Sequence, residues 1–263
     1  MDERALATYR EVMMADPPSG LTPAEEARLE HRFGQVWSRP GISRRERRLV
    51  TLSCAAFAVT AQPLIDHTYA ALKSGDLSIE ELLEVVLHFA VYCGWPKASN
   101  LEMYVRQSWM RLQQERGGDP TLPERRNDEL GENDWEKRLE RGAQEFREVN
   151  LVPAPGRDTP YQHAGILNFV FGHVWRRPDL CRRDRRFVTV ACVGLDEAPI
   201  PIQSHVGSAL RSGDLSKSEM DELILQFRAY DGDARADVLQ ATADAVWADL
   251  QTGTVSATAA PPQ

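Results

Sequence analysis

The chain contains the same stretch twice, at a constant distance of 138 residues. HTYAALKSGDLSIEE begins at His67, and HVGSALRSGDLSKSE begins at His205. Between residues 33–94 and 171–232, 28 of 62 positions are identical without a gap. Chance would give only a handful of identities. We therefore expect a duplicated unit, in which the fold of the first copy recurs in the second.

The repeat predicts where the domains begin and end. We expect a first domain over 1–114 and a second, more divergent domain over 135–250. Residues 115–134, ERGGDPTLPERRNDELGEND, are charged, rich in Gly and Pro and nearly without apolar residues, which is typical of a linker. Residues 251–263, QTGTVSATAAPPQ, are predicted to be a disordered tail.

Local signals along both copies are helical. A Ser or Thr followed three residues later by Glu is a capping box, and this pattern predicts helix starts at Thr22, Ser43, Ser78 and Ser216. Gly75 can take the left-handed conformation that ends the helix carrying His67, and Trp95-Pro96 opens another helix. No segment shows the alternation of a strand. We expect an all-α fold, a tandem duplication with about six helices per copy.

Composition argues against several classes of protein. The net charge of −8 disfavours nucleic acid or an anionic membrane surface as a partner. No apolar run approaches the roughly 20 residues that a membrane span needs, and the acidic start MDERALATYREVMMADPP does not resemble a signal peptide. The four cysteines form no C-x-x-C pair and suggest no disulfide framework. We expect a cytoplasmic protein.

Several fragments together resemble a known family. They are FGQVWSRPGI, Arg47 in RRLVTL, the histidine before AALKSGDLS, and EELLEVVLHFAVYCGWPKAS (80–99). In this order they resemble the carboxymuconolactone decarboxylase family, which also contains the alkylhydroperoxidase D proteins. The resemblance covers roughly 4–112 and 141–250, although YDGDARAD (230–237) replaces YCGWPKAS in the second copy. It implies compact helical domains that associate into rings, so we expect a homo-oligomer: a trimer of tandem chains, or a dimer.

The resemblance also locates the expected chemistry. The thiol branch of the family uses C-x-x-C-x-x-x-H, and its cysteine positions fall here on Thr60 and Pro63, and on Ala198 and Pro201. Neither copy therefore has the dithiol that reduces peroxides in that branch.

The decarboxylase branch is matched better, but two of its acids are replaced. The glutamate that members often carry four residues before the histidine falls on Pro63 and Pro201. The acid nineteen residues before it falls on Arg48 and Arg186. The usual carboxylate partner of the imidazole is thus missing from both copies.

A histidine and an arginine pair remain in each copy as candidate site residues. Decarboxylation requires a held carboxylate, a stabilised oxyanion and a proton delivered to carbon. Arg47, Arg48 and Arg185 are predicted to bind a carboxylate, and His67 and His205, titrating near neutrality, to donate the proton. No cofactor is required. The alternative is that these histidines pack in the core and that the arginines form a solvated helix turn or interface ion pairs.

Three further side chains are candidates in the first copy. Glu84 and His88 lie one helical turn apart and suit a carboxylate–imidazole pair, but no third ligand stands at a readable spacing, so we expect no metal. We include Glu84 and Cys93 among the predicted substrate-binding residues, although a free cysteine is usually a small buried apolar residue.

These observations favour a cofactor-independent lyase or isomerase acting on a small carboxylated lactone, enol or aromatic-derived acid. The first copy is expected to carry the activity because its YCGWPKAS segment is intact. Two alternatives stay open. One is a non-catalytic oligomeric binding or scaffold protein that kept the fold, and the other is a residual thiol peroxidase activity of Cys93.

Overall fold

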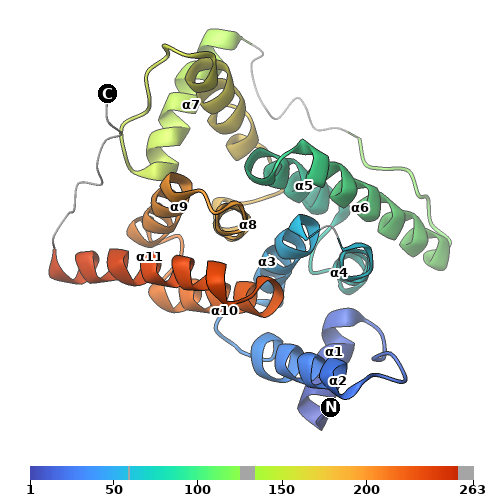
Figure 1. Cartoon of the computed structure of the whole chain (residues 1–263). Helices are drawn as coiled ribbons and strands as arrows, with labels where there is room; N and C mark the ends of the chain where they lie inside the picture. The colour runs from blue at the N-terminus through green and yellow to red at the C-terminus, as the bar shows by residue number, and fades with distance from the viewer. Residues whose placement is uncertain (59, 125–133, 254–263) are drawn as a thin grey trace.

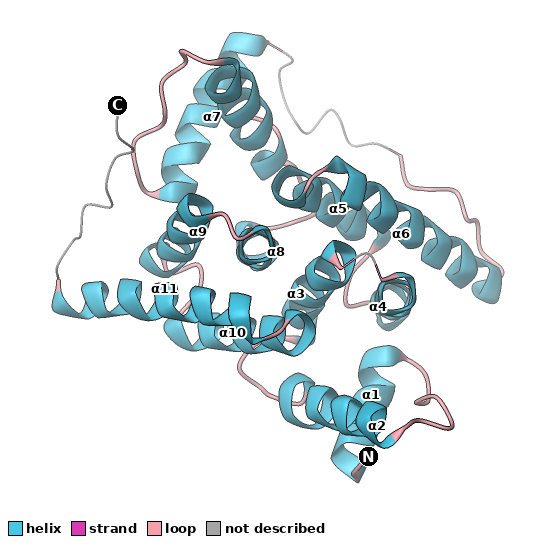
Figure 2. Ribbon diagram, in the orientation of Figure 1, coloured by secondary structure: helices cyan, strands magenta, loops and turns pink. Residues whose placement is uncertain are grey.

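The computed structural model describes residues 1–58, 60–124 and 134–253. In Figure 2 these residues form helices joined by loops, and none of them lies in a strand. The expected all-α fold is therefore confirmed. Within the same three ranges, no helix is long and apolar enough to pass through a lipid bilayer.

Helices of the two copies recur at the spacing of the sequence repeat. The first copy comprises α1 (Glu3–Met13), α2 (Pro23–Leu29), the π-helix η1 (Glu30–Trp37), α3 (Arg44–Phe57), α4 (Ala61–Ser74), α5 (Ile79–Cys93) and α6 (Trp95–Arg116). The second comprises α7 (Trp135–Asn150), the π-helix η3 (Tyr161–Phe171), the 3₁₀-helix η4 (Val174–Arg176), α8 (Arg182–Asp196), α9 (Pro199–Ser212), α10 (Lys217–Asp231) and α11 (Asp233–Thr252). The starts of α3 to α6 each lie 138 residues before those of α8 to α11.

The domain boundaries stay predictions. Helix α6 continues to Arg116, two residues past the predicted end of the first domain, and α11 continues to Thr252, inside the predicted tail. The middle of the predicted linker, 125–133, and most of the predicted tail, 254–263, lie outside the described residues. The predicted assembly of several chains into a trimer or dimer likewise stays a prediction.

The helix starts predicted from capping boxes are confirmed. At Thr22, Ser43, Ser78 and Ser216 the hydroxyl accepts from the backbone N–H three residues on, and the Glu at that position accepts from the cap's own backbone N–H. Gly75 ends α4 at φ 74°, the left-handed conformation that glycine adopts without a steric penalty. These features were predictable because each depends on residues within one turn of the chain.

The helix that follows Thr22 departs from the expected shape. Its α-helical part ends at Leu29, and the chain continues to Trp37 as the π-helix η1. This wider segment buries Phe33 and Trp37, whose rings stack at a centroid distance of 6.4 Å. Hydrophobic spacing did not reveal the change, because α- and π-helices both place residues four apart near one face.

The two copies pack into one core. Helix α3 lies against α8 and α10, and α5 lies against α8; in Figure 1, α3 and α8 occupy the middle of the molecule. Fully buried side chains of both copies, among them Leu49 and Leu52 of α3 and Val188 and Val190 of α8, belong to a single apolar cluster. Burial of this shared surface is the main force that holds the copies together.

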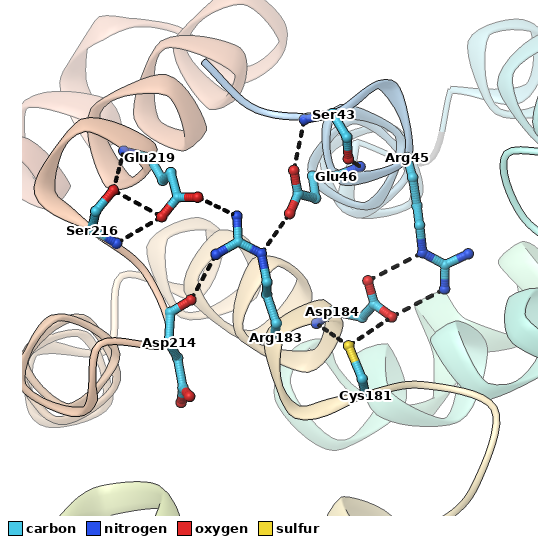
Figure 3. Close-up of polar contacts among 9 residues, drawn as sticks. All are labelled: Ser43, Arg45, Glu46, Cys181, Arg183, Asp184, Asp214, Ser216 and Glu219. Carbon is cyan, nitrogen blue, oxygen red and sulfur yellow. Dashed lines mark hydrogen bonds and ion pairs between the residues drawn. The ribbon is translucent and has the colours of Figure 1, made fainter. Parts of the chain in front are cut away.

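Ion pairs also cross between the copies, from the first turns of α3 and α8 (Figure 3). Arg45 reaches Asp184 with an Nη2–Oδ2 distance of 3.0 Å. In the reverse direction, Arg183 reaches Glu46 at 2.6 Å, and it also pairs with Glu219 of its own copy at 2.6 Å. The RRERR and RRDRR segments therefore form reciprocal contacts between the copies, and part of this arginine cluster serves the fold.

Candidate active site

His67 lies where α4 of the first copy meets α10 of the second. Its side chain is only 4% exposed. The imidazole stacks on Trp37 at a centroid distance of 6.1 Å and meets the edge of Tyr230 at 5.4 Å. Trp37 Nε1 donates a hydrogen bond of 2.7 Å to the Tyr230 hydroxyl, which fixes both rings. Since Tyr230 belongs to α10, the surroundings of His67 are built from both copies.

His205 has the same surroundings with the copies exchanged. Its ring stacks on Trp175 at 6.2 Å and meets the edge of Tyr92 at 5.3 Å. Trp175 Nε1 donates to the Tyr92 hydroxyl at 2.8 Å. Tyr92 is the tyrosine of the YCGWPKAS segment, so this segment completes the surroundings of the second histidine and not those of the first.

A buried arginine accompanies each histidine. Arg48 is fully buried; its Nε donates to Asp76 at 3.1 Å and its Nη2 donates to the Val12 carbonyl. Its guanidinium carbon lies 5.4 Å from the centroid of the Trp37 ring, on which His67 also stacks. Arg186 stands in the corresponding place, 5.6 Å from the Trp175 ring. Each imidazole is thus flanked by a cation where the resembling family often has an acid.

Two buried polar atoms of the first site lack a partner. Among the described residues, neither His67 Nδ1 nor Arg48 Nη1 has a hydrogen-bond partner. Buried donors and acceptors are nearly always paired, because an unpaired one forfeits its hydration without compensation. A cationic N–H and an imidazole nitrogen are thus both unpaired beside the same indole ring, whereas at the second site only the imidazole nitrogen, His205 Nδ1, is unpaired.

Burial sets the protonation of both histidines. Desolvation, reinforced by the positive charges of Arg48 and Arg32, lowers the pKa of His67 to about 3. Desolvation and the charge of Arg186 lower the pKa of His205 to about 3 as well. Both rings are neutral at pH 7, whereas the sequence suggested histidines that titrate near neutrality. The difference follows from burial and from the replacement of the family's acids by arginines.

These lowered pKa values predict an acid-sensitive fold. In the unfolded chain a histidine binds its proton near pH 6.5, and in the folded chain only near pH 3. The contribution of this pKa difference to the unfolding free energy is therefore fully present above pH 6.5 and is lost as the pH falls from 6.5 towards 3. Each histidine should remove about 2 kcal/mol of unfolding free energy between pH 6.5 and 5. Urea unfolding at pH 6.5 and at pH 5 measures this fall in unfolding free energy. The fall should be about 2 kcal/mol smaller in a His205→Gln variant than in the native chain.

The other two predicted arginines are held by the protein. Arg47 Nη2 donates to Glu222 at 2.7 Å and to the Arg39 carbonyl at 3.0 Å, and its Nη1 donates to Gln226 at 3.2 Å. Arg47 Nε has no partner among the described residues. Because both terminal nitrogens of Arg47 are engaged, the structure does not direct this side chain at the site of His67.

Arg185 mirrors this arrangement in the second copy. Its Nη2 donates to the Arg177 carbonyl at 2.7 Å and lies 3.7 Å from Glu84, while its Nη1 lies 3.3 Å from His88 Nδ1. Glu84 accepts two bonds from Arg177 Nε, at 2.7 and 2.9 Å. Glu84 and His88, which are part of α5, thus contact second-copy residues, so the structure brings neither of them together with His67.

The polar contact of Cys93 is with a backbone carbonyl of α8. Its Sγ is half-buried and lies 3.7 Å from the Cys192 carbonyl. Within the described ranges, no group of three or more His, Cys, Asp or Glu side chains is placed to hold a metal ion.

A surface pocket of about 360 Å³ lies elsewhere, between α8, α9 and α11, and contains none of the predicted site residues. It is lined by Gly194, Glu197, Pro199, Ile202, Gln203, Arg235, Val238 and Thr242.

Tyr92, Tyr230 and the role of the two tryptophans were not predicted from the sequence. A signal existed, since Trp37 and Trp175, like Tyr92 and Tyr230, are identical residues 138 positions apart. Identity across a repeat marks either core packing or a site, and these residues pack around the two histidines.

Comparison with known proteins supports the interpretation of the first copy. Residues 22–106, which include His67 and Arg48, match the carboxymuconolactone decarboxylase family. The nitrosuccinic acid decarboxylase npaB of Metarhizium robertsii is 40% identical over 74 residues, 28% of this chain and 51% of that protein. The 4-carboxymuconolactone decarboxylase of Acinetobacter baylyi is 37% identical over 75 residues, 28% of this chain and 54% of that protein. The chain thus spans about half the length of the curated relatives that it matches.

Proposed function

We propose that the chain decarboxylates a small carboxylated compound at the His67 site, because residues 22–106 match the carboxymuconolactone decarboxylase family. Both similar proteins named above are decarboxylases of carboxylated compounds. The observation that carries the proposal is the pair of unpartnered buried atoms, Arg48 Nη1 and His67 Nδ1. The proposed substrate class is a small lactone, enol or aromatic-derived acid.

Binding of the substrate carboxylate is assigned to Arg48. A carboxylate oxygen at Nη1 would form a charge-assisted hydrogen bond in a place that water barely reaches. Trp37 and Tyr230 would contact the apolar part of the same molecule, because their rings flank the imidazole. Binding therefore removes the unpaired donor and orients the reacting carbon near His67.

The chemical step moves one electron pair and consumes one proton. As the C–C bond to the leaving carboxylate breaks, its electron pair passes into the adjoining carbonyl or unsaturated group and CO₂ departs. The oxyanion that develops is stabilised by the positive charge of Arg48. A proton then adds to carbon, and His67 is the group placed to deliver it.

The low pKa of His67 fits this role only once substrate is bound. In the free site, burial and Arg48 hold the imidazole neutral. A bound carboxylate compensates the arginine charge and favours the imidazolium, so the pKa of His67 is higher in the complex than in the free site, while burial continues to lower it. The proton that the reaction consumes can then be taken up from solvent as the complex forms. This sequence needs no metal or organic cofactor.

Release of CO₂ tests the proposal. The native chain should release CO₂ from at least one member of a panel of small lactone, enol and nitro acids, at an unchanged rate after treatment with a chelator. An Arg48→Met variant keeps much of the side-chain volume but removes the cation, and should lower kcat/KM by about 10²–10³-fold. Thermal melting of the variant separates this loss from unfolding. If no panel member yields CO₂, or if Arg48→Met retains full turnover, the proposed reaction is wrong.

A second candidate is a non-catalytic carboxylate-binding protein. The observation that favours it is the replacement of both family acids, by Arg48 and by Pro63. Saturable binding of panel acids without any CO₂ release would identify this function.

A further inference from the structure

The two buried site arginines differ at one nitrogen. Arg186 Nη1 donates a hydrogen bond of 2.9 Å to the Ser208 hydroxyl. The residue 138 positions earlier is Ala70, which is fully buried and has no hydroxyl. Accordingly Arg48 Nη1 has no partner among the described residues, whereas Arg186 Nη1 has one.

The remaining nitrogens of the two side chains are matched. Both Nε atoms donate to an aspartate, Asp76 for Arg48 at 3.1 Å and Asp214 for Arg186 at 2.9 Å. Both Nη2 atoms donate to a backbone carbonyl of the copy's first α-helix, α1 or α7. The difference at Nη1 is therefore local, and it follows from the alanine–serine replacement between α4 and α9.

The differing nitrogen lies over the turn that carries the histidine. Ser208 is three residues after His205 on α9, so the two side chains share a helix face. Ala70 likewise lies three residues after His67 on α4, so by the repeat we expect Arg48 Nη1 over that turn. The histidine Nδ1 lacks a partner in both copies, so the two sites differ at the arginine nitrogen.

The second site is also more completely filled with rings. The His88 imidazole lies 5.0 Å from the Trp175 ring and 5.3 Å from the Tyr92 ring. The corresponding residue at the first site is Gln226, which has no ring and bonds to Thr51 at 2.8 Å.

We infer that the residue pair Ala70 and Ser208 decides which of the two histidine sites accepts a carboxylate: the first site is open to one, and the second is closed by the Ser208 hydroxyl. The ligand class is that of the proposed function, a small organic carboxylate, and in this respect the inference rests on it. A ligand oxygen at Arg48 would occupy the position that the serine hydroxyl occupies at Arg186. The carboxylate site thus depends on an alanine that makes no polar contact of its own.

Exchanging these two residues tests the inference without any turnover. Binding of acetate, succinate and benzoate to the full chain is measured by calorimetry. The native chain should bind at least one of these acids, with one site per chain. Ala70→Ser should weaken that binding by about 10-fold or more, because a hydroxyl then satisfies Arg48 Nη1. Ser208→Ala should add a second site per chain.

Matched variants control for the substitutions themselves. Ala71→Ser places a hydroxyl at the neighbouring buried position, and Ser53→Ala removes a buried hydroxyl that contacts neither histidine site and bonds to the Leu49 carbonyl and the Cys192 thiol. Both should bind as the native chain does, with far-ultraviolet circular dichroism showing that all four variants are folded. Should Ser208→Ala itself unfold, Ala70→Ser tests the inference on its own through the loss of binding at the first site.

Each result decides the matter. The inference is supported if the native chain binds an acid at one site, if Ala70→Ser weakens this binding, and if Ser208→Ala gives two sites per chain. This holds even if no acid is decarboxylated. No saturable binding by the native chain, equal binding after Ala70→Ser, or an unchanged stoichiometry after Ser208→Ala would overturn it. If only the proposed reaction is wrong, the acids still bind as inferred but no CO₂ is released.

Discussion

Replacing His67 with glutamine should lower turnover of a carboxylated substrate by about 10²–10⁴-fold while the chain stays folded. Glutamine approximates the size and polarity of histidine, but it cannot take up a proton and pass it to carbon. Substrate binding should change little, because the carboxylate is held by Arg48. Stopped assays of CO₂ release, with KM and kcat determined separately, should therefore show the loss in kcat.

His205→Gln is the matched control for this experiment. It removes an equally buried imidazole that stacks on an equivalent tryptophan. The loss of turnover should be far larger in His67→Gln than in His205→Gln, with similar thermal melting of the two variants. Equal losses would show that the sites do not differ in the way proposed, and full activity of His67→Gln would remove His67 from the mechanism.

Replacing Glu222 with alanine should lower the unfolding free energy by about 3–5 kcal/mol. Glu222 accepts from Arg47 at 2.7 Å, and these two side chains are 9% and 1% exposed. Without the carboxylate, the Arg47 cation stays buried with no counter-charge. The cost comes mainly from this stranded charge, since an intact buried pair contributes little net stability. Urea unfolding monitored by circular dichroism measures the change.

Two further variants separate this cause from general damage. Glu102 forms an exposed i,i+4 pair with Arg106, so Glu102→Ala should change stability by no more than about 0.5 kcal/mol. The double variant Arg47→Met, Glu222→Leu removes both charges and should recover most of the loss. If the double variant is no more stable than Glu222→Ala alone, the stranded charge is not the cause.

Local features of this fold were predictable from the sequence, and the partners across the core were not. Ser43, Ser78 and Gly75 act on their own turn of chain, so their neighbours in sequence suffice to place helix ends. The contact between His67 and Tyr230 joins residues 163 positions apart. Because Tyr92 and Tyr230 occupy equivalent places in the repeat, the sequence allows either tyrosine beside His67, and only helix packing decides.

The protonation of His67 could not be predicted for a related reason. The lowered pKa arises first from burial and then from the charges of Arg48 and Arg32. Burial of the His67 ring depends on the side chains packed against it, and one of them, Tyr230, comes from the other copy. By contrast, the sequence already shows Arg48 at the position where the resembling family often has an acid. A cation there is expected to lower the pKa of the imidazole, and Arg48 does so.

Each histidine of this fold is surrounded by residues of both copies, and this arrangement has an evolutionary consequence. If two identical chains paired in this way, any substitution would appear in both of their equivalent centres at once. Joined in a single polypeptide, the halves can accumulate separate substitutions, and one centre can specialise while its twin is reduced to a support. A single hydroxyl at position 208, absent at position 70, is the kind of divergence that such a fusion makes possible.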